Sequence, residues 1–245
     1  MVDAVVIIPT YNEIENIERI IRNVFALQRS FHILVVDDKS PDGTATVVKT
    51  LQSEFLDSLF LLEREDKQGL GTAYIAGFHW ALEKSYEFVF EMDADFSHNP
   101  NDLIRLYNAC IKDKADVAIG SRYVTGVNVV NWPMGRVLLS WGASKYVRFI
   151  TGMRIHDTTA GFVCYHKDVL KTIGLDTIKF VGYAFQIEMK YKAYKLGFKI
   201  VEIPVVFTDR TKGESKMSKG IISEAIFGVI KMRLQSLFQK RSINR

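Results

Sequence analysis

The sequence predicts an α/β protein built on a mostly parallel sheet with helices on both faces. Short runs of β-branched and other apolar residues alternate with longer segments in which apolar residues recur at helical spacing. Strands that are apolar on both sides are typical of parallel sheets buried between two helical layers. With 245 residues, 48% of them hydrophobic and 24% charged, the chain has enough apolar material for such a core.

The first half of the chain supplies the clearest elements. Apolar runs predict strands at 4–9, 31–38, 59–64, 86–93 and 115–123. Helical spacing predicts helices between them, at 12–27, 40–55, 69–84 and 99–110. The last of these begins with Asn99 and Pro100, which suit a helix cap and a first helical position.

The second half is less regular. It contains an apolar helix with interspersed basic residues at 132–152, a helical segment at 183–197, and two short strands broken at Pro204. Because no linker interrupts the chain, we expect one domain over residues 1–220. We expect Cys110 and Cys164 to be buried free thiols, and we predict neither a signal peptide nor a membrane span.

Residues 221–245 are predicted to form a basic amphipathic helix and tail. Apolar residues recur on one side of 222–238, and Glu224 and Lys231 fall opposite them. From Arg210 to the end the chain has nine Lys or Arg and two Glu, a local charge of +7, whereas the whole chain carries +4. Two alternatives stay open for this helix: packing on its own protein or a second subunit, or lying on an anionic membrane surface.

Polar side chains follow the predicted strands directly. The carboxyl ends of parallel strands form the binding crevice of such sheets. We therefore expect one site to collect the side chains found there, which are those of the PTYNE segment (9–13), Asp37, Asp38, Asp93, Asp95 and Arg122.

The carboxylates at 91–95 suggest a divalent cation. Glu91, Asp93 and Asp95 are two residues apart and would point the same way on an extended chain. Two aspartates separated by one residue can bind a hard cation that also holds a diphosphate. The alternative is a solvated turn, since Asp, Ser and Asn commonly build turns.

The other motifs fit a phosphorylated nucleotide, each with a structural alternative. Residues 35–44 could bind a ribose or base, or form an Asx-turn. Tyr11 and Glu13 could contact a base, or cap a helix. Arg122 suits phosphate. The basic segment 209–220 could close over a diphosphate, or be a solvated run of charge.

In this order, the motifs IIPTYNE, VVDDKSPDGT, DAD, GSRY and RTKGESKM resemble those of the family 2 glycosyltransferases of the GT-A fold. The resemblance is greatest to the dolichol-phosphate mannose synthases (polyprenol monophosphomannose synthases). It extends to about residue 220 through EMDADFSHNP, NWPMGRVLLSWGAS, TAGFVCY and GYAFQIEMKYKAYKLGF. It implies a GT-A-like three-layer α/β/α sandwich with a mostly parallel central sheet.

The resemblance also implies an activity and its cofactor. Mannose would pass from GDP-mannose to a polyprenyl (dolichyl or undecaprenyl) phosphate, with inversion, to give polyprenyl phosphate β-mannose. The cofactor would be Mg²⁺ or Mn²⁺. We expect a cytoplasmic protein, peripheral at the cytoplasmic face of a membrane, held there by the membrane surface or by a membrane-anchored subunit through its C-terminal helix. We expect no nucleic-acid partner.

The same resemblance assigns the site residues. Those that bind the nucleotide sugar would be Pro9, Tyr11, Glu13, Val36, Asp38, Asp93, Ala94, Asp95, Arg210 and Lys216. The lipid phosphate would be bound by Arg122, Arg136 and Ser140. The metal would be held by Asp93, Asp95 and Ser97, and the residues expected to carry catalysis are Asp95, Arg122, Arg210 and Lys216.

Two positions depart from the pattern of many relatives, which have glycine at Lys39 and glutamine at Ser97. Two alternative functions also stay open. One is the same transfer from UDP-glucose or another sugar nucleotide. The other is a catalytically silent nucleotide-binding scaffold, which the intact set of carboxylates and arginines disfavours.

Overall fold

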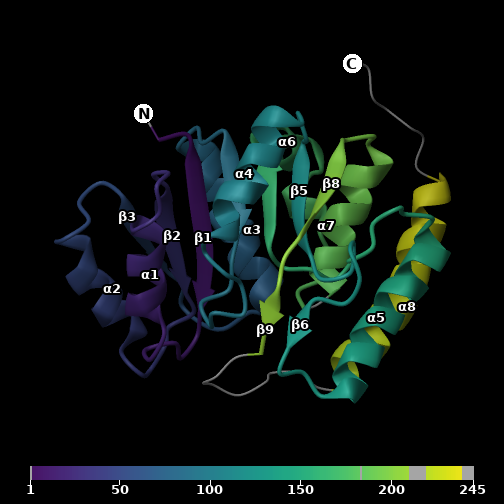
Figure 1. The fold of residues 1–245 in the computed structure, drawn as a ribbon, viewed down its shortest axis with the longest axis horizontal. Helices are drawn as coiled ribbons and strands as arrows, with labels where there is room; N and C mark the ends of the chain where they lie inside the picture. Colours follow the sequence, from purple (N-terminus) through teal and green to yellow (C-terminus); the bar gives the residue numbers. More distant parts are fainter. Residues whose placement is uncertain (1, 183, 210–218, 239–245) are drawn as a thin grey trace.

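The protein is described by a computed structural model that covers residues 2–182, 184–209 and 219–238; in the last range, side chains are described for 227–236. Its centre is a seven-stranded sheet in the order β3-β2-β1-β4-β7-β5-β8 (Figure 1). All neighbours pair in parallel except β7, which is antiparallel to both β4 and β5. The strands are β1 (Ala4–Thr10), β2 (His32–Asp37), β3 (Leu59–Glu63), β4 (Phe88–Glu91), β5 (Val117–Ser121), β7 (Val163–His166) and β8 (Ile200–Pro204).

Helices cover both faces of this sheet, which confirms the predicted three-layer sandwich. Alternate residues of β1 point to opposite faces. Val6 and Ile8 pack into the core under α1 (Ile17–Phe25), α2 (Thr44–Gln52) and α4 (Asp102–Lys112). Val5 and Ile7 pack into the core under α3 (Leu70–Glu83) and α7 (Ala184–Lys195).

Close packing of α3 on β1 depends on a glycine. A Cβ at Gly77 would lie 2.7 Å from Cγ2 of Ile7, so a side chain there would push the helix off the sheet. The helix carries Tyr74 on the same buried face, and this places the Tyr74 hydroxyl near the carboxyl end of β4.

Three helices begin later than the sequence suggests, and α2 is one of them, at Thr44 rather than residue 40. The first was expected from residue 12, but residues 11–16 form turns and Asn12 has a left-handed backbone with φ of 58°. The fourth begins at Asp102 rather than Asn99, whose side chain instead accepts a hydrogen bond from the backbone N–H of Asn101 at 3.1 Å. Before α1 and α4, the chain uses these residues to shape a loop at or next to the strand ends.

A second, smaller sheet lies beside the carboxyl ends of the strands. It pairs β6 (Val129–Val130) in parallel with β9 (Phe207–Thr208). After β6 the chain enters the long helix α5 (Met134–Thr151), which leads to β7, the short α6 (Lys167–Thr172) and the 3₁₀ turn η1 (Leu175–Thr177). The segment at 199–207, predicted as two strands, indeed divides into β8 and β9.

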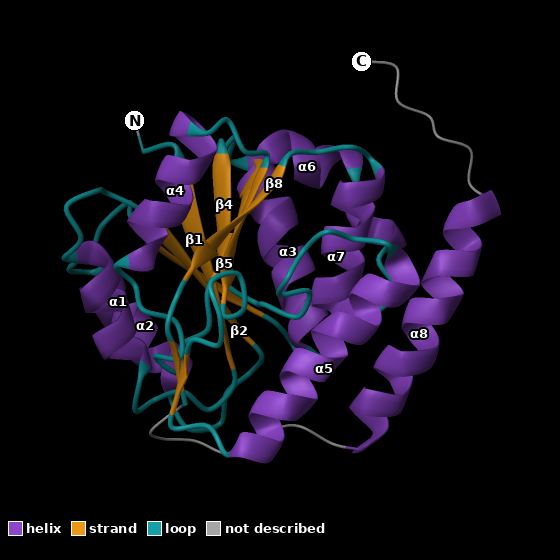
Figure 2. Ribbon diagram, turned by 45° about the vertical axis from the view of Figure 1, so that its right-hand side comes forward, coloured by secondary structure: helices purple, strands orange, loops and turns teal. Residues whose placement is uncertain are grey.

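The predicted tail helix is present as α8 (Lys219–Phe238) and lies alongside α5 (Figure 2). It also packs on α7, and its Val229 is buried in the core shared with these helices. The boundary at residue 220 stays a prediction. In the described part of the chain no helix is long and apolar enough to span a membrane.

Both cysteines are buried and free, as predicted, with their sulfur atoms 3.6 Å apart between α4 and β7.

Candidate functional site

The predicted nucleotide motifs meet at the carboxyl ends of β1 and β2. Asp37 is fully buried there and accepts hydrogen bonds from the hydroxyls of Thr10 and Ser40 at 2.7 and 2.6 Å. It also accepts the backbone N–H of Ser40 at 2.8 Å. Asp37 therefore holds the turn together through both of its carboxylate oxygens.

Asp38 is paired with an arginine that sequence reasoning missed. Nε of Arg64, at the end of β3, donates to Oδ1 of Asp38 at 2.6 Å, and Nη1 donates to Thr72 at 2.9 Å. Nη2 of Arg64 is buried without a hydrogen-bond partner in the described structure. A carboxylate acceptor beside an arginine donor matches an imino N–H next to a carbonyl, which both guanine and uracil present. The pair therefore suits a nucleobase without by itself choosing between these two.

The turn after Asp38 explains one departure from the family pattern. Lys39 has a left-handed backbone with φ of 55° and an exposed side chain. Glycine adopts this conformation without a steric penalty, whereas a lysine carries one of about 1–2 kcal/mol. The backbone shape that glycine favours is therefore kept, at some cost in stability.

The PTYNE segment lies beside this turn. Pro9 and Glu13 are half-buried, and Glu13 accepts a side-chain hydrogen bond from Asn16 at 3.0 Å. The ring of Tyr11 is covered by Nζ of Lys67 at 4.1 Å from its centroid, so a stacked base would displace this lysine. Val36 is fully buried in the core, paired with Pro9 of β1 and Leu62 of β3, and its contact with a nucleoside stays a prediction.

Asp42 has the structural role that the sequence left open. Its Oδ1 accepts from the backbone N–H and the hydroxyl of Thr44 at 2.9 and 2.6 Å, and its Oδ2 accepts from Ile14 N at 3.0 Å. This Asx-turn joins the 9–14 segment to the start of α2.

The carboxylates after β4 divide into two environments. The strand ends at Glu91, and the chain then turns through Phe96, whose φ is 61°. Ala94 and Asp95 are buried at the strand end, and Asp93 is half-buried and accepts a hydrogen bond from the Tyr74 hydroxyl at 3.2 Å. Oδ1 of Asp95 accepts the backbone N–H of Ser97 at 3.0 Å.

The donor groups of this turn fit a hard divalent cation. No group of three or more His, Cys, Asp or Glu that could hold a metal is found among the described residues. The turn nevertheless offers two carboxylates and the Ser97 hydroxyl, whose oxygen is buried without a hydrogen-bond partner among the described residues. Oxygen ligands of this kind suit Mg²⁺ or Mn²⁺, with phosphate oxygens completing the shell.

His98 holds the turn that follows β4 in place. Its Nδ1 accepts the backbone N–H of Asp93 at 3.1 Å, and its ring stacks on Phe162 with centroids 4.8 Å apart. Burial lowers the pKa of His98 to about 4, so the ring is neutral at pH 7 and can act as an acceptor. No ligand spacing singles out this histidine in the sequence, and in the structure it positions the backbone of Asp93.

Glu91 is held in the core by a hydrogen bond. It is fully buried, and its Oε2 accepts a hydrogen bond from Nε2 of Gln186 at 2.7 Å. Oε1 of Gln186 accepts from Nζ of Lys190 at 3.0 Å, and Lys190 also donates to the carbonyl of Ala160 at 2.5 Å. Burial raises the pKa of Glu91 and lowers that of Lys190. This network fastens the end of β4 to α7.

The predicted lipid-phosphate residues lie on the other side of the same edge. Arg122 is buried and is held by Asp157. The carboxylate of Asp157 accepts hydrogen bonds from the backbone N–H, Nε and Nη2 of Arg122 at 2.9, 2.7 and 2.6 Å. Arg136, in the first turn of α5, pairs with Asp209 at 2.7 Å. Ser140 is half-buried one turn further along α5.

Trp132 joins the two arginines. The guanidinium carbons of Arg136 and Arg122 lie 4.1 and 5.5 Å from the centroid of its ring. Its Nε1 is buried and has no hydrogen-bond partner in the part of the chain that is described. An unpaired indole N–H between two guanidinium groups is a further donor suited to a phosphate.

Strand β9 connects the two sides. Phe207 contacts His98 at 5.4 Å and Trp132 at 5.2 Å between ring centroids, and the backbone N–H of Thr208 donates to the carbonyl of Ser97 at 3.4 Å. The predicted diphosphate residues Arg210 and Lys216 follow β9 and lie outside the described residues.

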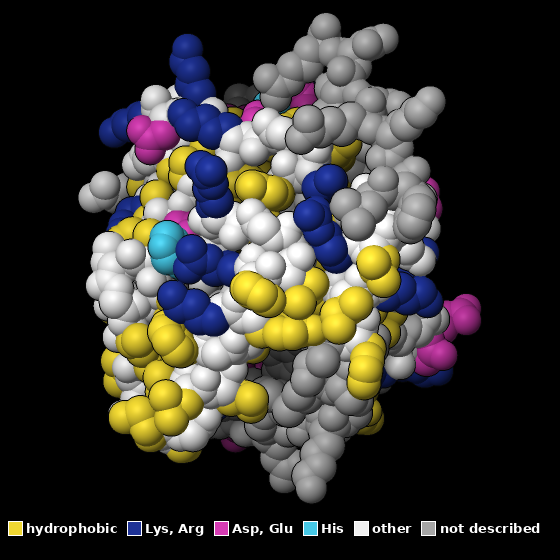
Figure 3. Space-filling view, turned by 90° about the vertical axis from the view of Figure 1, so that its right-hand side faces the viewer, with side chains coloured by type: hydrophobic (Ala, Val, Ile, Leu, Met, Phe, Trp, Pro, Cys, Tyr) yellow, Lys and Arg dark blue, Asp and Glu magenta, His cyan; other side chains and the backbone are white. Residues whose placement is uncertain are grey.

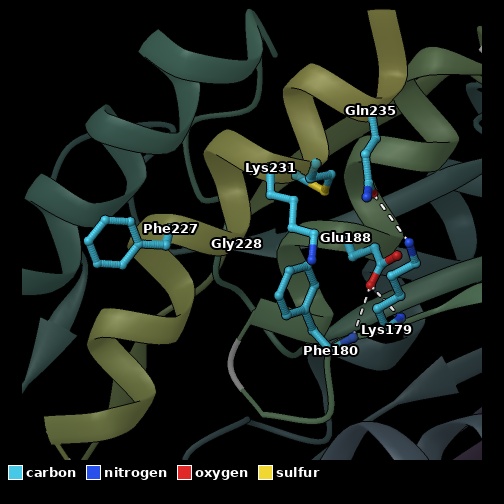
Figure 4. Close-up of a pocket in the computed structure, with 8 residues that line it drawn as sticks. Lys179, Phe180, Glu188, Phe227, Gly228, Lys231 and Gln235 are labelled. Atoms are coloured by element: carbon cyan, nitrogen blue, oxygen red, sulfur yellow. Dashed lines mark hydrogen bonds between the residues drawn. The ribbon is translucent and has the colours of Figure 1, made fainter. Parts of the chain in front are cut away.

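A separate cavity of 290 Å³ lies between α7 and α8 (Figure 4). It is lined by Lys179, Phe180, Glu188, Phe227, Gly228, Lys231, Met232 and Gln235. None of the predicted site residues lines it.

Comparison with known proteins agrees with this geometry. Residues 5–174 match the family described as Glycosyl transferase family 2. The chain belongs to this family. It is 48% identical over 224 residues to polyprenol monophosphomannose synthase of Mycolicibacterium smegmatis, covering 91% of this chain and 84% of the relative. It is 45% identical over 233 residues to undecaprenyl-phosphate mannosyltransferase of Micrococcus luteus, covering 95% of each.

Solved structures share the fold of this family 2 chain. Mannosyltransferase PcManGT from Pyrobaculum calidifontis, in complex with GDP-Man and Mn²⁺, superposes with a TM-score of 0.59 at 17% identity, covering 96% of this chain and 74% of that one. Glucosyl-3-phosphoglycerate synthase from Mycobacterium tuberculosis gives 0.66 at 17% identity, covering 95% and 79%. These likenesses confirm the GT-A-like architecture.

Proposed function

We propose that this chain transfers mannose from GDP-mannose to the phosphate of a polyprenyl lipid, as a dolichyl-phosphate β-D-mannosyltransferase or its undecaprenyl counterpart. The observation that carries the proposal is the 45–48% identity, over at least 91% of the chain, to two relatives named for mannosyl transfer to such lipids. The acidic donor side and the arginine side of one sheet edge fit a nucleotide sugar and a lipid phosphate.

The reaction is a single displacement at the anomeric carbon. An oxygen of the lipid phosphate attacks C1 of mannose, the bond from C1 to the GDP oxygen breaks, and the products are GDP and polyprenyl phosphate β-mannose. A phosphate monoester is mostly ionised near neutrality, with a second pKa of about 6, so it needs no general base. His98 agrees with this, because its Nδ1 is already used by the backbone of Asp93.

The residues of this chain have distinct tasks in the proposal. Asp38 and Arg64 hold the base, and Arg122, Arg136, Ser140 and Trp132 orient the attacking phosphate. Asp93, Asp95 and Ser97 would hold Mg²⁺ or Mn²⁺, which offsets the charge that grows on the leaving diphosphate. Arg210 and Lys216 would add positive charge there.

The decisive experiment measures transfer of label from radioactive GDP-mannose to the organic phase in the presence of a polyprenyl phosphate and Mn²⁺ or Mg²⁺. We expect transfer that EDTA abolishes and that GDP inhibits more strongly than UDP. Transfer from UDP-glucose alone would keep the fold and change the donor. Retention of the anomeric configuration would refute the single displacement, and no transfer from either donor would favour the silent scaffold.

Because the acceptor is a membrane lipid, we also propose that the protein works as a peripheral protein at the cytoplasmic face of a membrane. The C-terminal helix was expected to provide this attachment. Because α8 packs against α5 and α7, we expect α5 and α8 together to contribute the surface that attaches to the membrane.

A further inference from the structure

Helices α5 and α8 concentrate exposed apolar side chains. Of the sixteen large hydrophobic residues that are exposed in the described part of the chain, eight lie on these two helices. They are Met134, Leu138, Leu139, Trp141 and Phe149 on α5, and Phe227, Ile230 and Leu234 on α8. Isolated exposed apolar residues are ordinary, but a cluster on two adjacent elements indicates an interaction surface.

On α5 the apolar residues form a row. Met134, Leu138, Trp141 and Phe149 follow intervals of four, three and eight residues, which keep them on one side of a helix. They are 71, 61, 43 and 86% exposed. Ser144, Val147 and Thr151 form the buried side. At about 1.5 Å per residue, the row is about 22 Å long.

The described part of α8 continues this surface. Phe180 packs against α8 at Gly228, where a Cβ would come within 2.5 Å of its ring (Figure 4). This contact fixes the rotation of α8, with Val229 buried and Phe227, Ile230 and Leu234 exposed. Since α8 packs beside α5, their exposed sides belong to the face of the molecule seen in Figure 3.

The described side chains of this surface carry charge of one sign. Helix α5 contains Lys145 and Arg148 besides Arg136 and no acidic residue, and residues 227–236 of α8 contain Lys231 and Arg233 and no acidic residue. Figure 3 shows hydrophobic side chains across this face with lysine and arginine side chains beside them. Nζ of Lys145 lies 5.1 Å from the ring centroid of Trp141, a pairing of aromatic and cation that suits the headgroup region of a bilayer.

We propose that the exposed sides of α5 and α8 form one docking surface for an anionic phospholipid bilayer. The proposal rests on the proposed function. Helix α5 begins beside the site, where Arg136 and Ser140 are proposed to bind the lipid phosphate. Docking of the apolar row on α5 would therefore bring this part of the site to the membrane lipid. A second copy of this chain is a poorer occupant, since a symmetric contact would place the same cations against one another. Apolar side chains beside Lys and Arg, with no acidic residue on α5 or among residues 227–236 of α8, fit a layer of anionic headgroups over hydrocarbon.

The test is flotation of the full chain with vesicles of phosphatidylcholine alone or mixed with phosphatidylglycerol, without donor or acceptor. We expect binding to the anionic vesicles that weakens as salt is raised to about 0.5 M. The double variant Leu138→Gln/Phe149→Gln should lower partitioning about tenfold or more. Leu56→Gln is the matched control, because Leu56 is 74% exposed outside both helices and should leave binding unchanged.

A charge variant and a solution measurement complete the test. Lys145→Gln/Lys231→Gln should weaken binding to anionic vesicles only, whereas Lys171→Gln on α6 should not. Equal loss in the Leu56 control, or unchanged flotation of the double variant, would overturn the proposal. So would binding to native membranes but never to protein-free vesicles, or a dimer that the double variant dissociates in light scattering.

Failure of the proposed function can be told apart from failure of this surface. With a short, water-soluble prenyl phosphate as acceptor, the double variant should keep its transfer rate, and with acceptor embedded in vesicles it should lose about tenfold. Vesicle binding without any transfer would leave the surface standing and refute the activity.

Discussion

Replacing Asp157 by Asn should destabilise the protein by about 3–5 kcal/mol. Asp157 is fully buried and accepts three hydrogen bonds from Arg122, whose side chain is 9% exposed. The substitution keeps the size of the side chain but removes the negative charge. The guanidinium would then stay buried without its partner charge.

The magnitude follows from the contacts that change. An amide can accept through only one oxygen, and its NH₂ group would face one of the two donors Nε and Nη2 of Arg122. A hydrogen bond to a charged group contributes about 1.5–3 kcal/mol, and an unpaired buried charge adds its own cost. The loss should therefore exceed that of an exposed ion pair, which contributes about 1 kcal/mol or less.

The effect should also depend on pH. Burial by itself would raise the pKa of Asp157, but the charge and hydrogen bonds of Arg122 bring it below its ordinary value. Such a group stabilises the fold above its unfolded pKa of about 3.9 and loses this contribution as the pH falls through the folded value. The difference between the two proteins should be constant near neutrality and shrink below about pH 4.

Urea unfolding followed by circular dichroism measures both effects. Arg122→Met should also destabilise, because it leaves Asp157 buried and unpaired, and the double variant Arg122→Met/Asp157→Leu should lose at least about 2 kcal/mol less than the sum. Asp176→Asn, at a carboxylate that is 86% exposed, is the control. Additivity within about 0.5 kcal/mol, or a loss below about 1 kcal/mol for Asp157→Asn, would refute the reasoning.

Three further substitutions test the site. Lys39→Gly should raise the free energy of unfolding by about 0.5–1 kcal/mol, because the relief of about 1–2 kcal/mol of backbone strain is partly offset by the greater freedom of glycine in the unfolded chain. Lys39→Val should lower the free energy of unfolding, and urea midpoints measure both changes. Trp132→Phe, which keeps an aromatic ring and removes the indole N–H, should raise KM for the polyprenyl phosphate several-fold with kcat little changed, whereas Trp80→Phe should alter neither. Asp95→Asn should weaken Mn²⁺ binding at least tenfold, measured by electron paramagnetic resonance, and nearly abolish transfer. The control Asp42→Asn should leave Mn²⁺ binding intact and lower the free energy of unfolding by about 1–2 kcal/mol. Equal effects of the two substitutions on metal binding would contradict the assignment of Asp95.

The sequence predicted the first half of the fold well because local signals coincide there. Each of the first strands is a short apolar run, and a polar residue marks its carboxyl end. Arg64 carried the same signal at the end of the strand predicted at 59–64, and it could have been included on that ground. The structure places it against Asp38.

The remaining site residues depend on contacts between distant parts of the chain. Asp157 follows no predicted strand, and it meets Arg122 only because β7 is inserted between β4 and β5. The grouping of Glu91 with Asp93 and Asp95 assumes an extended chain, but the strand ends at Glu91. The partner of its carboxyl, Gln186, lies 95 residues further along the chain and could not be read from the local pattern.

The reversed direction of β7 has a consequence for how such enzymes diversify. The chain leaves the sheet after Ser121 and re-enters at Val163 on the adjacent strand, and the N–H of Gly120 already donates to the carbonyl of Phe162 at 2.8 Å. The excursion between these neighbouring points contains Arg122, Trp132, Arg136, Ser140, Asp157 and all of α5. Because the two ends of this segment meet, its replacement by another would leave strands β1, β2 and β4 in place. Such a replacement would change the residues proposed for the acceptor and keep those proposed for the donor.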